Sequence, residues 1–258
     1  MDSGATLVVD GVALETRSHA GNPAQPTLVL LHEGLGCVAL WRDFPARLAA
    51  ATACPVFLWS RAGYGASAPR ALPWPLDYMQ REALQLPRLL DAAGIGDCIL
   101  VGHSDGASIA LVAAGAANDS RIRGVVAMAP HVFTEAEGLA SIRAARVAFD
   151  TGDLRARLAR HHGDNVDCAF RGWSESWLDP LFEAWNLESF LSGINVPVLQ
   201  IQGRDDQYGT ARQLEAIARG VRGPVETHLL EACRHAPALE QPERTLALIK
   251  AFLLRLTA

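Results

Sequence analysis

The feature that most constrains the fold of this chain is the pentapeptide Gly-His-Ser-Asp-Gly at residues 102–106. An apolar stretch at 97–101 precedes it, and a run of small residues follows. A Gly-x-Ser-x-Gly sequence between a strand and a helix is typical of the nucleophile elbow, a sharp turn that lifts a serine hydroxyl clear of a sheet. The glycines are needed because the serine backbone is strained and the helix passes close to neighbouring strands. The pattern predicts that Ser104 is a nucleophile. An N-cap serine with Asp105 in the first helical turn is the alternative, but it would not require both glycines.

A serine hydroxyl is a poor nucleophile at neutral pH and needs a base, which in turn needs an orienting acid. After an elbow of this kind, the acid and then the histidine follow in chain order. Residues 196–202 have the pattern of a buried strand, and the Gly-Arg-Asp-Asp loop after them carries Asp205 and Asp206. Residues 225–230 have the pattern of the last strand, and His235 lies in the loop that follows. We therefore expect His235 to be the base and one of the two aspartates to be the acid.

Three further stretches carry a family resemblance. Residues 30–36, Leu-Leu-His-Glu-Gly-Leu-Gly, resemble the His-Gly oxyanion loop of the α/β-hydrolase superfamily. Residues 59–67 resemble its Asp-x-x-Gly-x-Gly-x-Ser loop, and residues 234–242 resemble its Gly-His-x-Pro-x-x-Glu-x-Pro ending. Together with the elbow, these ordered motifs make the chain similar to that superfamily over essentially its whole length. The chain departs from the family at three positions. Glu33 stands where the family usually has glycine, Ser60 where it usually has aspartate, and Arg234 where it often has glycine.

The resemblance implies further roles. The family spacing, in which the acid follows the loop glycine by three residues, selects Asp206 and leaves Asp205 as the alternative. The backbone N–H of Asp105 is expected to form half of an oxyanion hole, which stabilises negative charge on the substrate oxygen. The second donor is expected to be Gly34, with Leu35 as the alternative.

Short apolar runs alternate with helical patterns along most of the chain, which favours a parallel sheet wrapped by helices. The resemblance implies the same α/β class: a mostly parallel central sheet flanked by helices on both faces, with an inserted helical lid. After two short strands up to about residue 17, further strands are expected at 27–31, 55–59, 97–101, 122–128, 196–202 and 225–230. Helices are expected at 38–51, 77–93, 107–117, 136–150, 153–161 and before residue 256.

Residues 132–192 interrupt this alternation, at the position where the family carries its lid. We therefore expect a hydrolase core of residues 1–131 and 193–258, with residues 132–192 as a helical lid insertion. Bulky aromatic residues among polar neighbours suit a lid that closes an apolar cavity. Trp173 and Trp177 are accordingly candidate substrate contacts, although rings that only pack the lid onto the core would give the same pattern.

Other residues near the expected site have two interpretations. Glu33 and Leu35 belong to the oxyanion loop, and His131 follows a strand at the sheet edge where ligands gather, so all three are candidate substrate-binding residues. His103, inside the elbow, is expected to pack beside the sheet, and His32 to hold its own loop by hydrogen bonding.

Composition limits the partners. A formal net charge of −5 argues against nucleic acid and anionic membrane surfaces. The sequence shows no secretory signal and no apolar run long enough to cross a bilayer, and its five scattered cysteines suggest reduced thiols. We therefore expect a cytoplasmic protein with a small-molecule substrate, and the oligomeric state is left open. The His- and Asp-containing stretch at 161–168 fits no zinc spacing, so neither a metal nor a cofactor is expected.

These features predict a serine hydrolase that cleaves an ester or thioester of a small to medium acyl group through an acyl-enzyme on Ser104. Alternatives on the same triad are a carbon–carbon bond hydrolase, an amidase, a perhydrolase and an amino-acid-ester hydrolase. The last rests on Glu33 and Asp105, since α/β-hydrolases of the valacyclovir-hydrolase type have a similar Ser-Asp-Gly elbow and bind the substrate ammonium group with that aspartate. A ligand-binding protein without activity is disfavoured by the complete triad.

Overall fold

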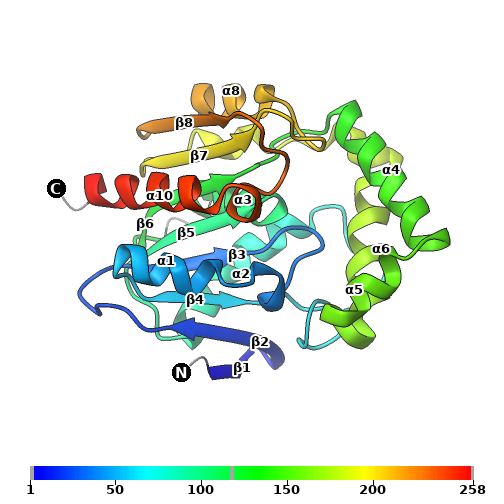
Figure 1. Ribbon diagram of the computed structural model, residues 1–258, viewed down its shortest axis with the longest axis horizontal. Helices are drawn as coiled ribbons and strands as arrows, with labels where there is room; N and C mark the ends of the chain where they lie inside the picture. Colours follow the sequence, from blue (N-terminus) through cyan, green and yellow to red (C-terminus); the bar gives the residue numbers. More distant parts are fainter. Residues whose placement is uncertain (1–2, 117–118, 257–258) are drawn as a thin grey trace.

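The computed structural model describes residues 3–116 and 119–256, and within them one eight-stranded sheet runs in the order β1-β2-β4-β3-β5-β6-β7-β8 (Figure 1). The strands are β1 (Ser3–Val9), β2 (Val12–His19), β3 (Thr27–Leu31), β4 (Val56–Trp59), β5 (Cys98–His103), β6 (Ile122–Met128), β7 (Val198–Gly203) and β8 (Val225–Leu230). β2 pairs antiparallel with β1 and β4, and every other neighbouring pair is parallel. The predicted mostly parallel sheet is confirmed.

Helices cover both faces of this sheet. α1 (Phe44–Thr52) and α10 (Pro242–Leu256) contact each other on one face. α2 (Tyr78–Ala92) and α3 (Asp105–Ala116) contact each other on the opposite face, where α8 (Ala211–Gly220) also packs. Because both faces are covered, β3, β4 and β5 carry nearly continuous runs of buried residues instead of an alternating pattern.

The helix expected at 38–51 is divided in two, which corrects that prediction. A 3₁₀ turn, η1 (Val38–Trp41), comes first, and α1 begins only at Phe44. Arg42 lies between them with a φ of 54°, a left-handed conformation that a continuous right-handed helix cannot contain. Pro45 then lies in the first turn of α1, where its missing N–H costs no helical hydrogen bond.

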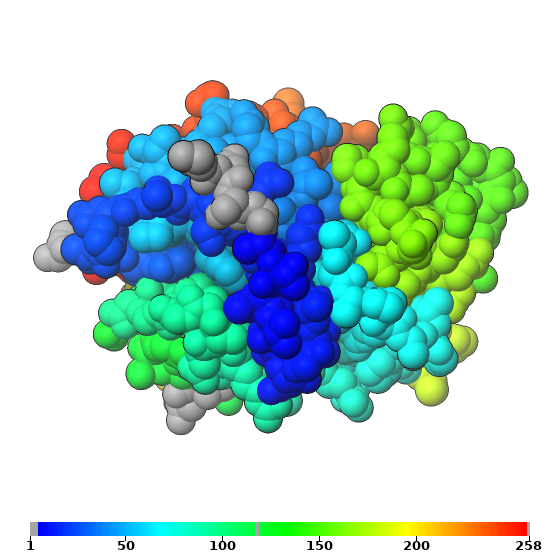
Figure 2. Space-filling model, turned by 90° about the horizontal axis from the view of Figure 1, so that it is seen from below, coloured from blue at the N-terminus to red at the C-terminus, as the bar shows by residue number. Residues whose placement is uncertain are grey.

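Residues 132–192 lie between β6 and β7 in the chain and are mostly helical. Their elements are α4 (Ala136–Thr151), α5 (Leu154–His162), η2 (Gly163–Asn165), α6 (Val166–Trp177), η3 (Pro180–Ala184) and α7 (Glu188–Leu191). In Figure 1 the helices α4, α5 and α6 stand at one end of the sheet. Figure 2 shows the same segment as a rounded block against the cyan part of the chain, where His162 and Asn165 hydrogen-bond to the loop after β4.

The remaining helix, α9 (Pro237–Glu240), follows β8 and precedes α10. None of the helices in the described ranges is long and apolar enough to cross a membrane. The loops after β3, β5, β7 and β8 leave the parallel strands at their carboxyl ends, the edge at which α/β sheets gather their chemistry.

Candidate active site

Ser104 occupies the turn between β5 and α3 with a φ of 54°. A Cβ atom at Gly102 would lie 2.3 Å from the carbonyl oxygen of Gly106, and one at Gly106 would lie 2.1 Å from that of Leu31. Neither position has room for a side chain, so both glycines are needed to bring the helix against the strands. This is the tight strand–turn–helix geometry that the pentapeptide predicts.

The loop after β8 brings His235 to the serine. Its Nε2 lies 3.0 Å from Ser104 Oγ, and its Nδ1 lies 2.8 and 3.0 Å from the two carboxylate oxygens of Asp206. A carboxylate can only accept, so Nδ1 carries the proton and Nε2 is left to accept from the serine hydroxyl. The structure therefore aligns these three side chains in the order that a general-base relay requires.

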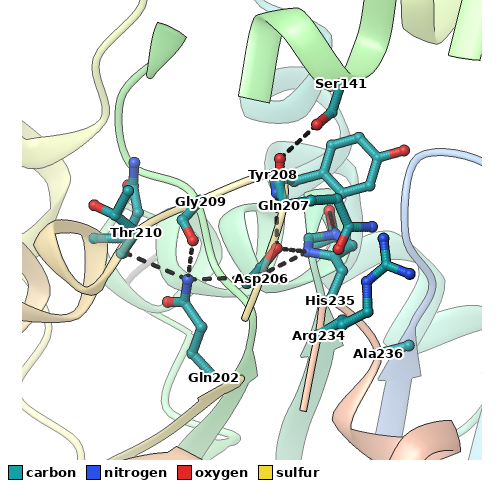
Figure 3. A network of polar contacts seen from close by, with 12 residues as sticks. Ser141, Gln202, Asp206, Gln207, Tyr208, Gly209, Thr210, Arg234, His235 and Ala236 are labelled. Atoms are coloured by element: carbon teal, nitrogen blue, oxygen red, sulfur yellow. Dashed lines mark hydrogen bonds and ion pairs between the residues drawn. The ribbon is translucent and has the colours of Figure 1, made fainter. Parts of the chain in front are cut away.

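The Asp206 carboxylate accepts hydrogen bonds from several neighbouring residues (Figure 3). The N–H of Tyr208 donates to Oδ1 at 2.8 Å, and the amide of Gln202 donates to Oδ2 at 3.3 Å. Burial opposes ionisation, but the hydrogen bond and the electrostatic interaction with His235 outweigh it, so the pKa of Asp206 is lowered. The Asp205 side chain, in contrast, is exposed and bonds to nothing in the described residues.

Two backbone N–H groups beside Ser104 have no acceptor. Those of Gly34 and Asp105 donate to no group within the described residues, although both residues line the cavity that contains Ser104. Arg61 helps to hold the loop that contains Gly34, because its guanidinium donates to the carbonyl of His32 at 2.6 Å. His32 Nδ1–H donates to the Glu33 carbonyl at 2.7 Å, so His32 holds its own loop as the sequence predicts.

The cavity above Ser104 has a volume of about 390 Å³. The predicted contacts Glu33, Leu35, His131, Trp173 and Trp177 all line it, together with Ile142 from α4 and Tyr208 from the acid loop. Burial lowers the pKa of His131 to about 4, with a smaller contribution from electrostatic interaction with His235, so this imidazole is neutral at pH 7. The cavity thus combines aromatic and aliphatic side chains with charged ones, among them Asp105, Arg234 and Glu240.

Trp173 and Trp177 combine cavity lining with structural contacts. A Cβ at Gly34 would lie 2.3 Å from the Trp173 indole, so this ring rests directly on the oxyanion loop. The Trp177 Nε1–H donates to the Tyr78 hydroxyl at 3.1 Å, and that hydroxyl donates to Asp105 Oδ2 at 2.5 Å. The second oxygen of the Asp105 carboxylate is buried without a hydrogen-bond partner in the described residues.

Residues 26–189 match the family model described as the alpha/beta hydrolase fold. The chain belongs to the α/β-hydrolase fold family. The matched range includes Ser104 and ends before Asp206 and His235, so the roles of those two residues rest on the geometry above. A search of curated protein sequences found no match.

Solved α/β-hydrolase structures resemble the chain over nearly its full length. A bacterial membrane phospholipase A has a TM-score of 0.79 at 19% identity, covering 99% of this chain and 87% of that one. The esterase RhEst1 from Rhodococcus sp. ECU1013 has a TM-score of 0.75 at 22% identity, covering 98% and 99%. The enol-lactonase from Burkholderia xenovorans LB400 has a TM-score of 0.73 at 21% identity, covering 97% and 100%. At these identities the likeness shows the shared fold.

Sequence reasoning missed several residues that shape this α/β-hydrolase site. Glu240, part of the C-terminal motif, accepts from the N–H groups of Arg234 and Ala236, both at 2.9 Å, and so braces the turn that carries His235. His103 does not simply pack beside the sheet, because its Nε2 lies 2.7 Å from the His235 carbonyl oxygen. His103 and His235 are far apart in sequence, so their contact could not be predicted. Of these residues only Glu240, through the C-terminal motif, could have been singled out from the sequence.

Trp185 and the stretch at 161–168 lie away from the cavity. Trp185 is buried and stacks on Phe182 at 5.0 Å between ring centroids, outside the cavity wall. In the stretch at 161–168, His162 bonds to backbone atoms and Asp167 pairs with Arg155. No group of three or more potential metal ligands exists in the described part of the chain.

Proposed function

We propose that this α/β-hydrolase is a serine hydrolase that cleaves an ester or thioester of a small to medium acyl group through an acyl-enzyme on Ser104. The observation that carries the proposal is the continuous line of contacts from Asp206 through His235 to Ser104. Two unpaired N–H groups lie on the same cavity, as stabilisation of an oxyanion requires.

The mechanism follows from these contacts. Ser104 Oγ attacks the acyl carbon while His235 Nε2 takes the hydroxyl proton, and negative charge develops on the substrate oxygen. The N–H groups of Gly34 and Asp105 stabilise this oxyanion. The intermediate then collapses, the bond to the leaving oxygen or sulfur breaks, and His235 returns the proton to that atom. Water repeats the sequence on the acyl-enzyme, giving the acid and the free serine. This chemistry needs neither a metal nor a cofactor.

The cavity supports the proposed acyl size. A volume of about 390 Å³ walled by Leu35, Ile142, Trp173 and Trp177 suits an apolar group of modest length. We assign the covering role to residues 132–192 as a helical lid over a core formed by residues 1–131 and 193–258.

The test combines covalent labelling with a graded substrate series. A fluorophosphonate probe is expected to label the wild-type protein and not Ser104→Ala, because only an activated serine reacts with it. p-Nitrophenyl esters of increasing chain length, with acyl thioesters beside them, then define the acyl preference. A binding protein without activity would stay unlabelled. A carbon–carbon bond hydrolase or a perhydrolase would be labelled but would turn over simple esters poorly.

A second candidate function, hydrolysis of amino-acid esters, is favoured by one observation. The unpartnered Asp105 oxygen is buried in the cavity wall, and an ammonium group would supply its missing donor. The test compares kcat/KM for an α-amino ester and its neutral isostere in wild type and Asp105→Asn. A preference for the amino ester that the substitution removes supports this function, and equal rates for both esters in both proteins reject it.

A further inference from the structure

Glu33 and His103 meet directly beneath the His235 loop. Glu33 Oε2 lies 3.6 Å from Nδ1 of His103, and Nε2 of His103 lies 2.7 Å from the carbonyl oxygen of His235. The His103 side chain is 9% exposed, so these contacts account for both of its ring nitrogens. Three segments therefore meet at this imidazole: the loop after β3 that carries Glu33, the turn between β5 and α3, and the loop after β8 that carries His235.

The placement of the Glu33 carboxylate is specific. It folds back under its own turn, in which the Gly36 N–H donates to the Glu33 carbonyl at 3.1 Å. A Cβ at Gly36 would lie 2.4 Å from Glu33 Oε2, so the glycine leaves the space that the carboxylate fills. Glu33 thus replaces the glycine usual in the family with a side chain that reaches His103.

The two partners determine the protonation of His103. One ring nitrogen faces a carbonyl oxygen and the other faces a carboxylate, and both of these groups can only accept a hydrogen. A neutral imidazole would turn a lone pair toward one of them. Protonation of both nitrogens satisfies both acceptors, and the carboxylate at ion-pair distance favours this charged form by raising the pKa of His103.

We propose that Glu33 and His103 are positioning residues: a charged pair that holds the backbone carbonyl of His235 and so aims its ring at Ser104. This inference rests on the proposed function, in which His235 is the base. It complements the role of Glu240, which accepts from the N–H groups on either side of His235. The turn is then held by its N–H groups from one side and by its carbonyl from the other.

The surrounding charges define a pH window for the pair. Glu33, His235 and Asp206 face His103, and His131 lies farther along the same cavity. Burial would lower the pKa of His103, but Glu33 outweighs it and raises that pKa above 6.5. Burial would raise the pKa of Glu33, but His103 lowers it from 4.5 to about 2. The pair is therefore complete between pH 4.5 and 6.5, and its contribution is lost as pH rises through the folded-state pKa of His103 or falls toward 2.

The first test measures ester hydrolysis against pH in wild type, Glu33→Gln and His103→Gln. We expect kcat of His103→Gln to fall about tenfold with little change in KM, because a misaimed base slows the chemical step more than binding. The wild type should lose activity on an alkaline limb above pH 6.5. That limb should move to lower pH in Glu33→Gln and disappear in His103→Gln.

A matched control is available on β8. His228 Nε2 and Glu226 Oε1 form another carboxylate–imidazole contact, at 2.7 Å, away from the cavity. His228→Gln should leave both kcat and the alkaline limb unchanged. A wild-type pH profile retained in His103→Gln would overturn the proposal, because a purely structural imidazole would produce no such limb.

The second test reads the proton directly and does not depend on activity. Imidazole ¹⁵N NMR should show both nitrogens of His103 protonated at pH 6. The His103 signal is assigned from its absence in His103→Gln or, if His103→Gln does not fold, from sequential labelling in Glu33→Gln. Glu33→Gln should convert the ring to its neutral form at a lower pH than wild type. A neutral His103 at pH 6 in wild type would reject the pair. If Ser104→Ala retained full esterase activity, the proposed function would fail, while the NMR result would still decide the charge.

Discussion

The loops at the carboxyl ends of the strands and the helical segment at 132–192 both border the cavity, yet they are held in place differently. The loops are fixed by backbone geometry: the positive φ of Ser104, the close packing at Gly102 and Gly106, and hydrogen bonds to main-chain atoms. The segment is fixed mainly by side chains. His162 and Asn165 bond to the loops after β3 and β4. Aromatic rings also meet across the boundary, where His162 packs near Tyr64 and Trp177 near His131.

This difference predicts different consequences of substitution. A change in the loops should move atoms that take part in the proposed reaction, because the loop backbone directly positions those atoms. A change in the segment should alter cavity shape or stability, because its rings contact the site through packing. Substitutions in the two regions test this division, from the largest expected effect to the smallest.

Ser104→Ala and His235→Ala should each lower kcat about 10⁵- to 10⁶-fold, because members of a relay act as a unit. The double variant should be about as inactive as either single one. Steady-state hydrolysis of a p-nitrophenyl ester measures the loss, and circular dichroism checks the fold. Substantial activity in either variant would show that the loops do not carry the chemistry.

Asp206→Asn should lower kcat by about 10⁴-fold, because an amide favours the wrong tautomer and orientation of His235. Asp205→Asn is the matched control, one residue away and exposed, and it should keep kcat within about twofold. The same ester assay compares the two variants. A severe loss in Asp205→Asn with a mild one in Asp206→Asn would reverse the assignment of the acid.

Trp173→Ala and Trp185→Ala should separate cavity lining from packing within the helical segment. Trp185 packs outside the cavity, so its removal should cost about 3–5 kcal/mol of unfolding free energy and leave acyl preference unchanged. Trp173 lines the cavity, so its removal should shift preference toward longer acyl chains at a smaller cost in stability. Urea unfolding and the ester series measure the two effects. Equal destabilisation with unchanged preference in both variants would make the rings purely structural.

Acid should weaken the loop region through His131. The pKa of His131 falls from 6.5 in the unfolded chain to about 4 in the fold, so the unfolded chain binds the proton more readily between these values. Stability is therefore complete above pH 6.5 and declines as pH falls, by about 2 kcal/mol at pH 5. Urea unfolding at pH 7.5 and pH 5 should show a smaller decline in His131→Phe than in wild type. An unchanged decline would assign the acid sensitivity elsewhere, for example to His162, whose pKa is also lowered by burial.

The fold was predictable, and Ser104, Asp206 and His235 could be named as candidates, because their signals are local. The elbow pentapeptide, the acid loop and the C-terminal motif each carry their information within a few residues, and chain order links them. The division of the expected helix at 38–51 was not foreseen, because a single left-handed Arg42 leaves no clear trace in composition. The position of Asp206 followed from family spacing, which the geometry with His235 supports.

The contacts between distant segments could not be predicted from one sequence. His103 and Glu33 are 70 positions apart, and nothing in the oxyanion-loop motif indicates which side chain the glutamate will meet. The line from Trp177 through Tyr78 to Asp105 joins three helices in the same way. Such partners become visible only once the fold brings parts of α2, α3 and α6 into contact.

The contact between Gly34 and Trp173 has a consequence for how this protein can acquire new selectivity. The indole rests on the backbone whose N–H we propose as an oxyanion donor, and it also lines the cavity that we propose holds the acyl group. Trimming it would enlarge the chamber and at the same time remove the support of the turn beneath. Laboratory selection for bulkier substrates should therefore pass first through slower variants, and regain speed through second changes that stiffen residues 33–36.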